Sequence, residues 1–182
     1  MPRVLALLVF VVLGVIFPAG AVAQTSSTGG AQFSDAAPIV TPGSKATLLP
    51  DGSAAAPADA PPQVQAAIFA ANKLLDKPYK YGGGHGKVED SGYDCSGTVS
   101  YALIAAKLLK TPLDSGSFLS WGLKGKGTWI TVYTNPGHAF AVIAGLRLDT
   151  SAAGDPSGRK GPRWRPTLRS TRGFRARHPE GF

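Results

Sequence analysis

The sequence predicts an α+β fold in which helices come first and antiparallel strands follow. Apolar residues recur at helical spacing in two stretches before residue 110, and β-branched and aromatic residues dominate short segments from residue 128 to 150. Helices and strands that are segregated along the chain in this way are typical of α+β proteins. The chain has 182 residues, a length that suits one domain.

The first 23 residues have the layout of a secretory signal peptide. Arg3 supplies a positive charge, residues 4–17 form an apolar run, and Ala21-Val22-Ala23 is a small-x-small cleavage site. The run is shorter than the roughly 20 residues that a membrane span needs, so we expect cleavage after Ala23 rather than a retained anchor. The protein is therefore expected to be secreted, to the periplasm or the cell wall.

Residues 24–62 predict a disordered linker. They are rich in Ala, Gly, Ser, Thr and Pro and almost free of aromatic residues, so they bury too little apolar surface to offset the entropy of ordering. The folded domain is then expected to span residues 63–182, which is enough for one modest core.

Two helices are expected at the start of this domain. The first begins at residues 61–62, which are both proline, and ends before Pro78. Its apolar stripe consists of Val64, Ile68, Ala71 and Leu75. The second begins at Asp94 or Cys95 and runs to about Lys110. Its apolar stripe consists of Val99, Ala102, Leu103 and Ala106.

Strands are expected after the helices. Residues 128–133 are β-rich, and residues 135–137 (Asn-Pro-Gly) indicate a turn. Residues 138–144 predict a buried strand and 146–150 another, with a glycine hinge between them. A last short strand is expected within residues 174–178.

The chain is basic, with a formal net charge of +8, or +7 once Arg3 leaves with the signal peptide. Residues 147–182 hold nine Lys and Arg against three acidic residues, a local balance of +6. Such a surface attracts anionic partners. Export favours anionic cell-wall polymers or lipid headgroups over nucleic acid, and a basic surface without a partner is the alternative.

Cys95 is the only cysteine, so it has no disulfide partner within the chain. In an oxidising compartment a lone thiol is a liability unless it is reactive or buried. The first turn of a helix lowers the pKa of a thiol and offers free N–H groups to an oxyanion. Two interpretations stay open: a thiolate nucleophile, or an apolar cysteine that faces the core.

A thiolate nucleophile needs a base, and the chain has three histidines. His138 opens an apolar strand after a Pro-Gly turn and is expected to point into a cleft. Asp149 is expected beside it across the hairpin, to fix the imidazole tautomer, or else to cap the following turn. We expect His85 to be a solvated loop residue rather than part of the cleft, and His178 to lie on the surface.

A metal site built from these histidines is the competing arrangement. No two of them have the i, i+4 spacing of a helical zinc motif, and there is no second cysteine. No metal is therefore expected.

Three motifs resemble the NlpC family of cell-wall cysteine peptidases. They are Tyr79-Lys80-Tyr81-Gly82-Gly83, Gly92-Tyr93-Asp94-Cys95-Ser96-Gly97, and Gly137-His138 at the head of an apolar strand. They occur in matching order, and the resemblance covers roughly residues 63–150. It implies a papain-like fold, with N-terminal helices of which the nucleophile helix packs on a central antiparallel sheet.

The resemblance also implies hydrolysis of peptide bonds in peptidoglycan stem peptides, commonly between D-glutamate and the diamino acid, without a cofactor. Cys95 then corresponds to the nucleophile, His138 to the base and Asp149 to a polar third residue. The positions that correspond to contacts with the stem peptide are Tyr81, Asp94 and Ser96. The negative charge of the Asp94 carboxylate suits the free amino end of the peptide.

The chain departs from the family in three places. Gly127-Thr128 stands where a Gly-Asp pair is usual, the third residue is more often histidine, and the segment around Gly161-Pro162-Arg163-Trp164 has no counterpart. Two alternatives remain: an amidase or acyltransferase that uses the same Cys–His pair, or a non-catalytic cell-wall-binding module. We expect a monomer.

Overall fold

The computed structural model describes residues 38–182, so the expected signal peptide and residues 24–37 of the expected linker lie outside the described residues. The helices are α1 (Pro62–Asn72), α2 (Cys95–Ala105) and the short 3-10 helix η1 (Ser117–Ser120). The strands are β1 (Val40–Thr41), β2 (Thr47–Leu48), β3 (Ala54–Pro57), β4 (Leu123–Lys124), β5 (Ile130–Asn135), β6 (His138–Ile143), β7 (Leu146–Leu148), β8 (Trp164–Arg165) and β9 (Arg175–His178). The expected α+β class is confirmed.

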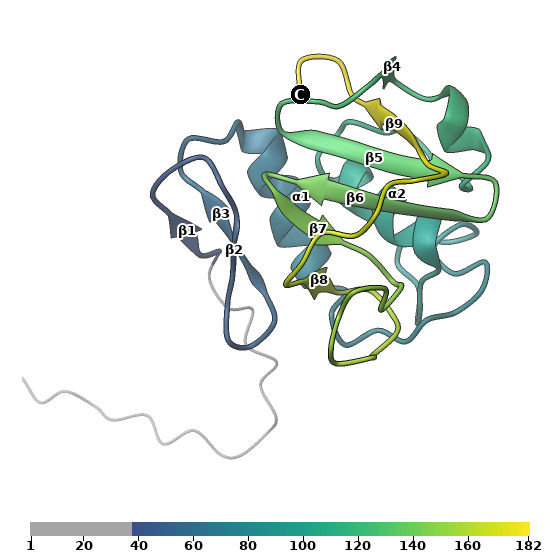
Figure 1. The fold of residues 1–182 in the computed structure, drawn as a ribbon, viewed down its shortest axis with the longest axis horizontal. Helices are drawn as coiled ribbons and strands as arrows, with labels where there is room; N and C mark the ends of the chain where they lie inside the picture. The colour runs from purple at the N-terminus through teal and green to yellow at the C-terminus, as the bar shows by residue number, and fades with distance from the viewer. Residues whose placement is uncertain (1–37) are drawn as a thin grey trace, which may run out of the picture. The chain divides into compact units, whose positions relative to one another are not determined.

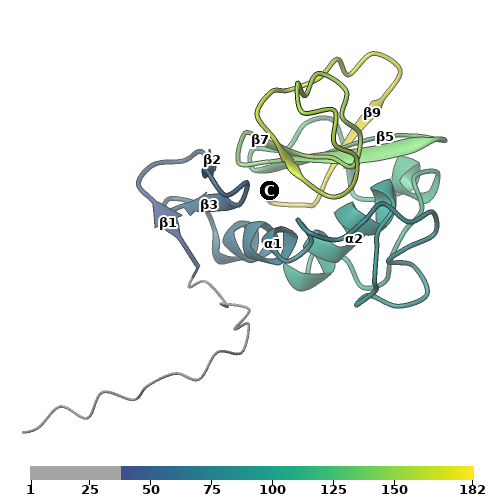
Figure 2. The ribbon, with the colours of Figure 1, turned by 90° about the horizontal axis from the view of Figure 1, so that it is seen from below.

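The main sheet has six strands in the order β4-β9-β5-β6-β7-β8, and every neighbouring pair is antiparallel. Both helices lie on one side of this sheet, and the long segments that follow β7 cover the other side (Figure 2). The hairpin of β5 and β6 forms the centre of the sheet (Figure 1). Cys95 therefore begins a helix on one side of the sheet, and His138 begins β6, a central strand of that sheet.

The core fills the space between the helices and the sheet. The apolar stripes expected on the two helices are buried, except that Leu75 is only partly buried. The sheet meets them with small side chains at Ala139 and Ala141, followed by Ile143. Since each fully buried Val, Leu or Ile stabilises the fold by about 1.5–3 kcal/mol, this layer is the main source of stability.

Both helices end earlier than the sequence predicts. After Asn72 the chain continues in tight turns, with the N–H of Leu74 bonded to the carbonyl of Ala71. After Ala105 the chain turns away at Lys107, whose φ of 59° is left-handed. The apolar spacing continues past both ends, so periodicity alone overestimated the helix lengths.

The expected linker is in part an ordered sheet, so the domain boundary at residue 63 is wrong. β3 pairs with β1 in parallel and with β2 in antiparallel orientation. Residues 54–56, all alanine, are fully buried against α1, and the Asn72 side chain bonds the N–H and the carbonyl of Ala54, each at 2.9 Å. Alanine buries little area in itself, but its small size permits this close approach, which composition does not reveal.

Strands β6, β7 and β9 lie where the sequence predicts them, and β5 begins two residues later than expected. The two-residue strands β4 and β8 at the sheet edges were not foreseen, because elements of this length have no periodicity to detect. No helix in residues 38–182 has the length and apolar character needed to cross a membrane.

Candidate functional site

Cys95 is the first residue of α2, and Asp94 is its N-cap. The Asp94 carboxylate accepts a hydrogen bond from the N–H of Gly97 at 2.7 Å, which fixes the start of the helix. The cysteine is 9 % exposed and has no disulfide. The thiol therefore lies at the positive end of a helix dipole, where the first N–H groups have no acceptor within the helix.

His138, the first residue of β6, lies next to this thiol. Burial raises the pKa of Cys95, but hydrogen bonds from the His138 side chain and the Ala139 N–H outweigh it, so that the pKa is lower than usual. The thiol is thus easier to ionise than a free cysteine.

Asp149 lies on the other side of the imidazole, with its Oδ1 atom 2.9 Å from Nε2 of His138. Burial lowers the pKa of His138, but the bonds to Asp149 and Cys95 overcome it and raise the pKa to about 9. Because Nε2 faces the carboxylate, Nδ1 is the nitrogen left to exchange a proton with the thiol. The structure thus brings the three sequence-predicted catalytic residues together in the order Cys95, His138, Asp149.

The Asp149 side chain is fully buried among positive groups. It accepts hydrogen bonds from the N–H of Ser151 at 2.8 Å and from Arg169 at 3.2 Å, and Nε of Arg147 lies 3.8 Å away. Burial raises the pKa of this carboxyl, and its bonds to His138, Ser151 and Arg169 lower it below the usual value. A carboxylate ion therefore faces the imidazole.

Arg169 also covers the face of the sheet that points away from the helices. Its guanidinium lies 5.3 Å from the ring centres of both Phe140 and Phe174. Phe174 in turn packs edge-on against His138, with ring centres 6.1 Å apart. Arg169 and Phe174 thus pack against the His138–Asp149 pair.

The basic segment 147–182, which was expected to form a surface, has some of its arginines in the interior. Arg147, Arg165 and Arg177 are buried. The Arg165 guanidinium bonds Asp155 at 2.6 Å, the carbonyl of Asp149 at 3.0 Å and two further carbonyls. Arg165 and Arg177 hold loops in place, because a guanidinium has five donors in a planar fork that can bind several carbonyls at once.

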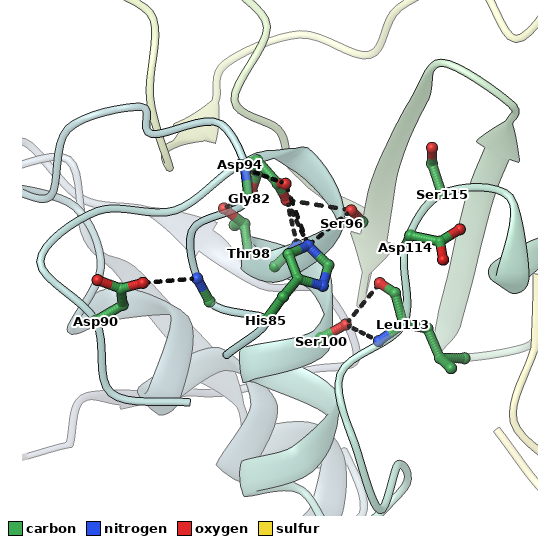
Figure 3. Close-up of polar contacts among 12 residues, drawn as sticks. Gly82, His85, Asp90, Asp94, Ser96, Thr98, Ser100, Leu113, Asp114 and Ser115 are labelled. Carbon is green, nitrogen blue, oxygen red and sulfur yellow. Dashed lines mark hydrogen bonds and ion pairs between the residues drawn. The ribbon is translucent and has the colours of Figure 1, made fainter. Parts of the chain in front are cut away.

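A cleft of about 420 Å³ opens beside Cys95. All three residues predicted to contact a substrate line it: Tyr81, which is 92 % exposed, Asp94 and Ser96. Figure 3 shows Asp94, His85 and Ser96 gathered on one side of this region, with Asp114 and Ser115 on a separate loop.

The prediction that His85 is a solvated loop residue is wrong. Its Nε2 atom lies 3.0 Å from Oδ1 of Asp94 and 3.3 Å from Oγ of Ser96, and it lines the cleft. The glycine loop, residues 81–86, can fold back over the helix because Gly97 has no side chain, since a Cβ there would overlap the carbonyl oxygen of Gly83. Sequence periodicity carries no signal for such a contact.

The Asp94 carboxylate is already engaged by the protein. Besides the helix cap it accepts bonds from the N–H of Gly82 at 3.0 Å, from His85 and from the Ser96 hydroxyl at 3.1 Å. The Asp94 carboxylate therefore joins the glycine loop to the first turn of α2.

Asp114 is a cleft residue that the sequence did not reveal. Its carboxylate accepts bonds from the N–H and hydroxyl of Ser117, at 2.8 and 2.9 Å, at the start of η1. The side chain is exposed to the cleft, so its charge is available to a ligand. A capping role is the only signal that the Asp-Ser-Gly-Ser stretch carries.

A second cleft, of about 320 Å³, opens beside His138. It is lined by Tyr79, His138, Thr150, Ser151, Ala152 and Lys160. Tyr79 lines both clefts, so the Cys95–His138 pair lies where the two clefts meet.

The third histidine lies apart from both clefts, with Nδ1 of His178 3.0 Å from the carbonyl of Gly125. Within residues 38–182, no group of His, Cys, Asp and Glu side chains has the arrangement of a metal site. No known protein-family model and no curated protein sequence matches the chain.

Proposed function

We propose that the protein is a secreted, papain-like cysteine peptidase that cleaves peptide bonds in peptidoglycan stem peptides. The observation that carries the proposal is the line from the helix-terminal Cys95 through His138 to the buried Asp149, with a cleft on each side. Each member has the ionisation that the chemistry requires: a thiol with a lowered pKa, an imidazole with a pKa of about 9, and an ionised carboxylate.

The Cys95 thiolate attacks the carbonyl carbon of the scissile peptide bond and forms a C–S bond. The carbonyl oxygen gains the negative charge beside the first N–H groups of α2, which stabilise it. Nδ1 of His138 then gives its proton to the leaving nitrogen, the C–N bond breaks, and a thioester remains. A water molecule attacks the thioester, His138 takes its proton, and the acid product leaves as the thiolate is restored.

The charges of the first cleft favour the expected substrate class. Asp94 and Asp114 make it acidic, although His85 offsets part of that charge when protonated. A stem peptide that has been released from the glycan strand has a free amino end, and it would place that cation near Asp114, which is less engaged than Asp94. The D-glutamate–diamino acid bond is the proposed site of cleavage.

The other functions considered differ in testable ways. An amidase or acyltransferase would share the acyl-enzyme and differ only in the bond cleaved or in the acceptor. A non-catalytic wall-binding module would need no ionisable thiol, so the lowered pKa of Cys95 favours an enzyme.

The experiment that tests the proposal is digestion of purified peptidoglycan by residues 24–182, compared with Cys95→Ala. Soluble fragments are identified by mass. We expect stem-peptide fragments from the native sequence alone, and their masses identify the bond. No release from either protein, together with slow alkylation of Cys95 at neutral pH, would favour the binding module.

A further inference from the structure

The two clefts are lined by different members of the Cys95–His138 pair. The first is lined by Cys95 and not by His138, whereas the second is lined by His138 and not by Cys95. In a thiolate mechanism the imidazole must reach the leaving nitrogen, so the residue that carries this nitrogen lies on the histidine side. The second cleft is therefore the place for the leaving part of the substrate.

The clefts also differ in charge. Two carboxylates, Asp94 and Asp114, line the first cleft, and no acidic residue lines the second. Lys160 lines the second cleft, and its ammonium has no carboxylate within ion-pair distance anywhere in residues 38–182. The groove is thus acidic on the acyl side and basic on the leaving side.

Two residues with hydroxyl groups line the second cleft together with Lys160. Thr150 is almost fully buried and Ser151 half-buried, and among residues 38–182 neither hydroxyl donates a hydrogen bond to another group. The Ser151 hydroxyl only accepts, from the N–H of Ala153 at 3.2 Å. An ammonium and two free O–H donors on the wall of one cleft suit a carboxylate ion, which only accepts hydrogen bonds.

We propose that the second cleft binds a leaving residue that carries a free carboxylate, held by Lys160 with Thr150 and Ser151. This inference rests on the proposed peptidase function. Such a site would favour a diamino acid whose side chain carries a carboxylate beside its amine over a diamino acid whose side chain ends in an amine alone.

The test uses two synthetic peptides, L-alanyl-γ-D-glutamyl-meso-diaminopimelate and L-alanyl-γ-D-glutamyl-L-lysine, both with the main-chain carboxyl amidated. They differ only in the side-chain carboxylate. Initial rates give kcat/KM for the native sequence and for Lys160→Gln, Lys160→Arg and Lys73→Gln. Lys73 is exposed and lines neither cleft, so its variant controls for the loss of one charge.

We expect the native sequence to prefer the diaminopimelate peptide by about 3- to 5-fold, the size typical of a partly exposed ion pair. Lys160→Gln should abolish this preference, while Lys160→Arg and Lys73→Gln should retain it. A preference that survives in Lys160→Gln would overturn the inference and leave the peptidase proposal standing.

If neither peptide is cleaved, measured affinities still separate the carboxylate-site proposal from the peptidase proposal. Affinities are then measured by calorimetry with Cys95→Ala and with the double variant Cys95→Ala, Lys160→Gln. A preference for the diaminopimelate peptide that is lost in the double variant supports the carboxylate site although the peptidase proposal fails. Equal affinities in both proteins would overturn the carboxylate site as well.

Discussion

Nε2 of His138 lies 2.9 Å from Oδ1 of Asp149, although eleven positions separate the two residues along the chain. The contact follows from the register of β6 and β7, in which Ala141 is opposite Leu148. Asp149 comes next after Leu148 and so lies opposite Phe140, on the face of the sheet that His138 shares. A hairpin with a two-residue turn is therefore sufficient to align a base with its carboxylate.

Removal of the Asp149 charge should weaken catalysis more than binding. In Asp149→Asn the pKa of His138 should fall, since the bond to Asp149 raises it. We expect kcat/KM to drop on the order of 10²-fold, the scale of general acid–base catalysis. The variant should also be less stable by roughly 3 kcal/mol, because Arg169 and Arg147 lose their buried counter-ion. Asp59→Asn, at an exposed position, is the control; equal rates in both variants would contradict a catalytic role.

The alkylation rate of Cys95 should report its partnership with His138. In the native sequence, iodoacetamide should react with an apparent thiol pKa below the ordinary value, because His138 and the Ala139 N–H stabilise the thiolate. His138→Ala removes one of these donors while burial persists, so the apparent pKa should rise. Rates from pH 5 to 10 measure both values, and His178→Ala should leave the profile unchanged. Superimposed profiles for all three proteins would show that the imidazole does not act on the thiol.

The pH dependence of kcat/KM should have two limbs. Activity should rise as Cys95 ionises, at a pH below the usual thiol range. It should fall near pH 9, since His138 has a raised pKa of about 9 and must carry a proton for the leaving nitrogen. In Asp149→Asn the upper limb should move to lower pH. An upper limb near 6.5 in the native sequence would show that the imidazole is not held as a cation.

Gly97→Ala should disturb the first cleft without touching a catalytic group. The added Cβ would overlap the carbonyl of Gly83, so the glycine loop must move or the helix must shift. We expect a loss of about 1–3 kcal/mol in the free energy of unfolding, as in other overpacked sites. Gly86→Ala, where nothing lies within 4 Å of the new Cβ, is the matched control. Equal melting temperatures for the two variants would mean that the loop does not depend on this approach.

Asp114→Asn should reduce affinity for peptides with a free amino end. The asparagine retains an oxygen for the N–H of Ser117, and its NH2 group can donate to the Ser117 hydroxyl in place of the bond that the carboxylate accepts, so both contacts can persist without the charge. We expect KM to rise a few-fold, in keeping with an exposed ion pair, and kcat to change little. An acetylated peptide, which has no amino cation, should show equal KM values with both proteins. The same rise for both peptides would assign Asp114 to the structure of η1 instead.

The features of this molecule that the sequence predicts are local ones. Cys95 at a helix start, His138 after a turn and Asp149 across a short hairpin follow from spacing alone, because backbone periodicity fixes where those residues point. Spacing predicts the contact of His138 with Asp149, whereas the approach of His138 to Cys95 was expected from the need of a thiolate for a base and from the family resemblance.

The rest depends on contacts made by loops and short strands, which have no periodic pattern in the sequence. Burial of Ala54–Pro57 depends on α1, and the contact of His85 with Asp94 depends on the absence of a side chain at Gly97. Arg165 is buried because several carbonyls converge on it. None of these contacts has a periodic signal in the sequence, even where the partners are as near as Arg165 and Gly161, so composition assigned the alanines to a linker and the arginines to the surface.

The arginines around Asp149 restrict how this site can change in evolution. A neutral or cationic residue in place of the aspartate leaves the guanidinium groups of Arg147 and Arg169 without their shared anion. The substitution therefore costs less stability in a chain in which at least one of these arginines has already been replaced. The identity of residue 149 is in this way coupled to the identities of residues 147 and 169.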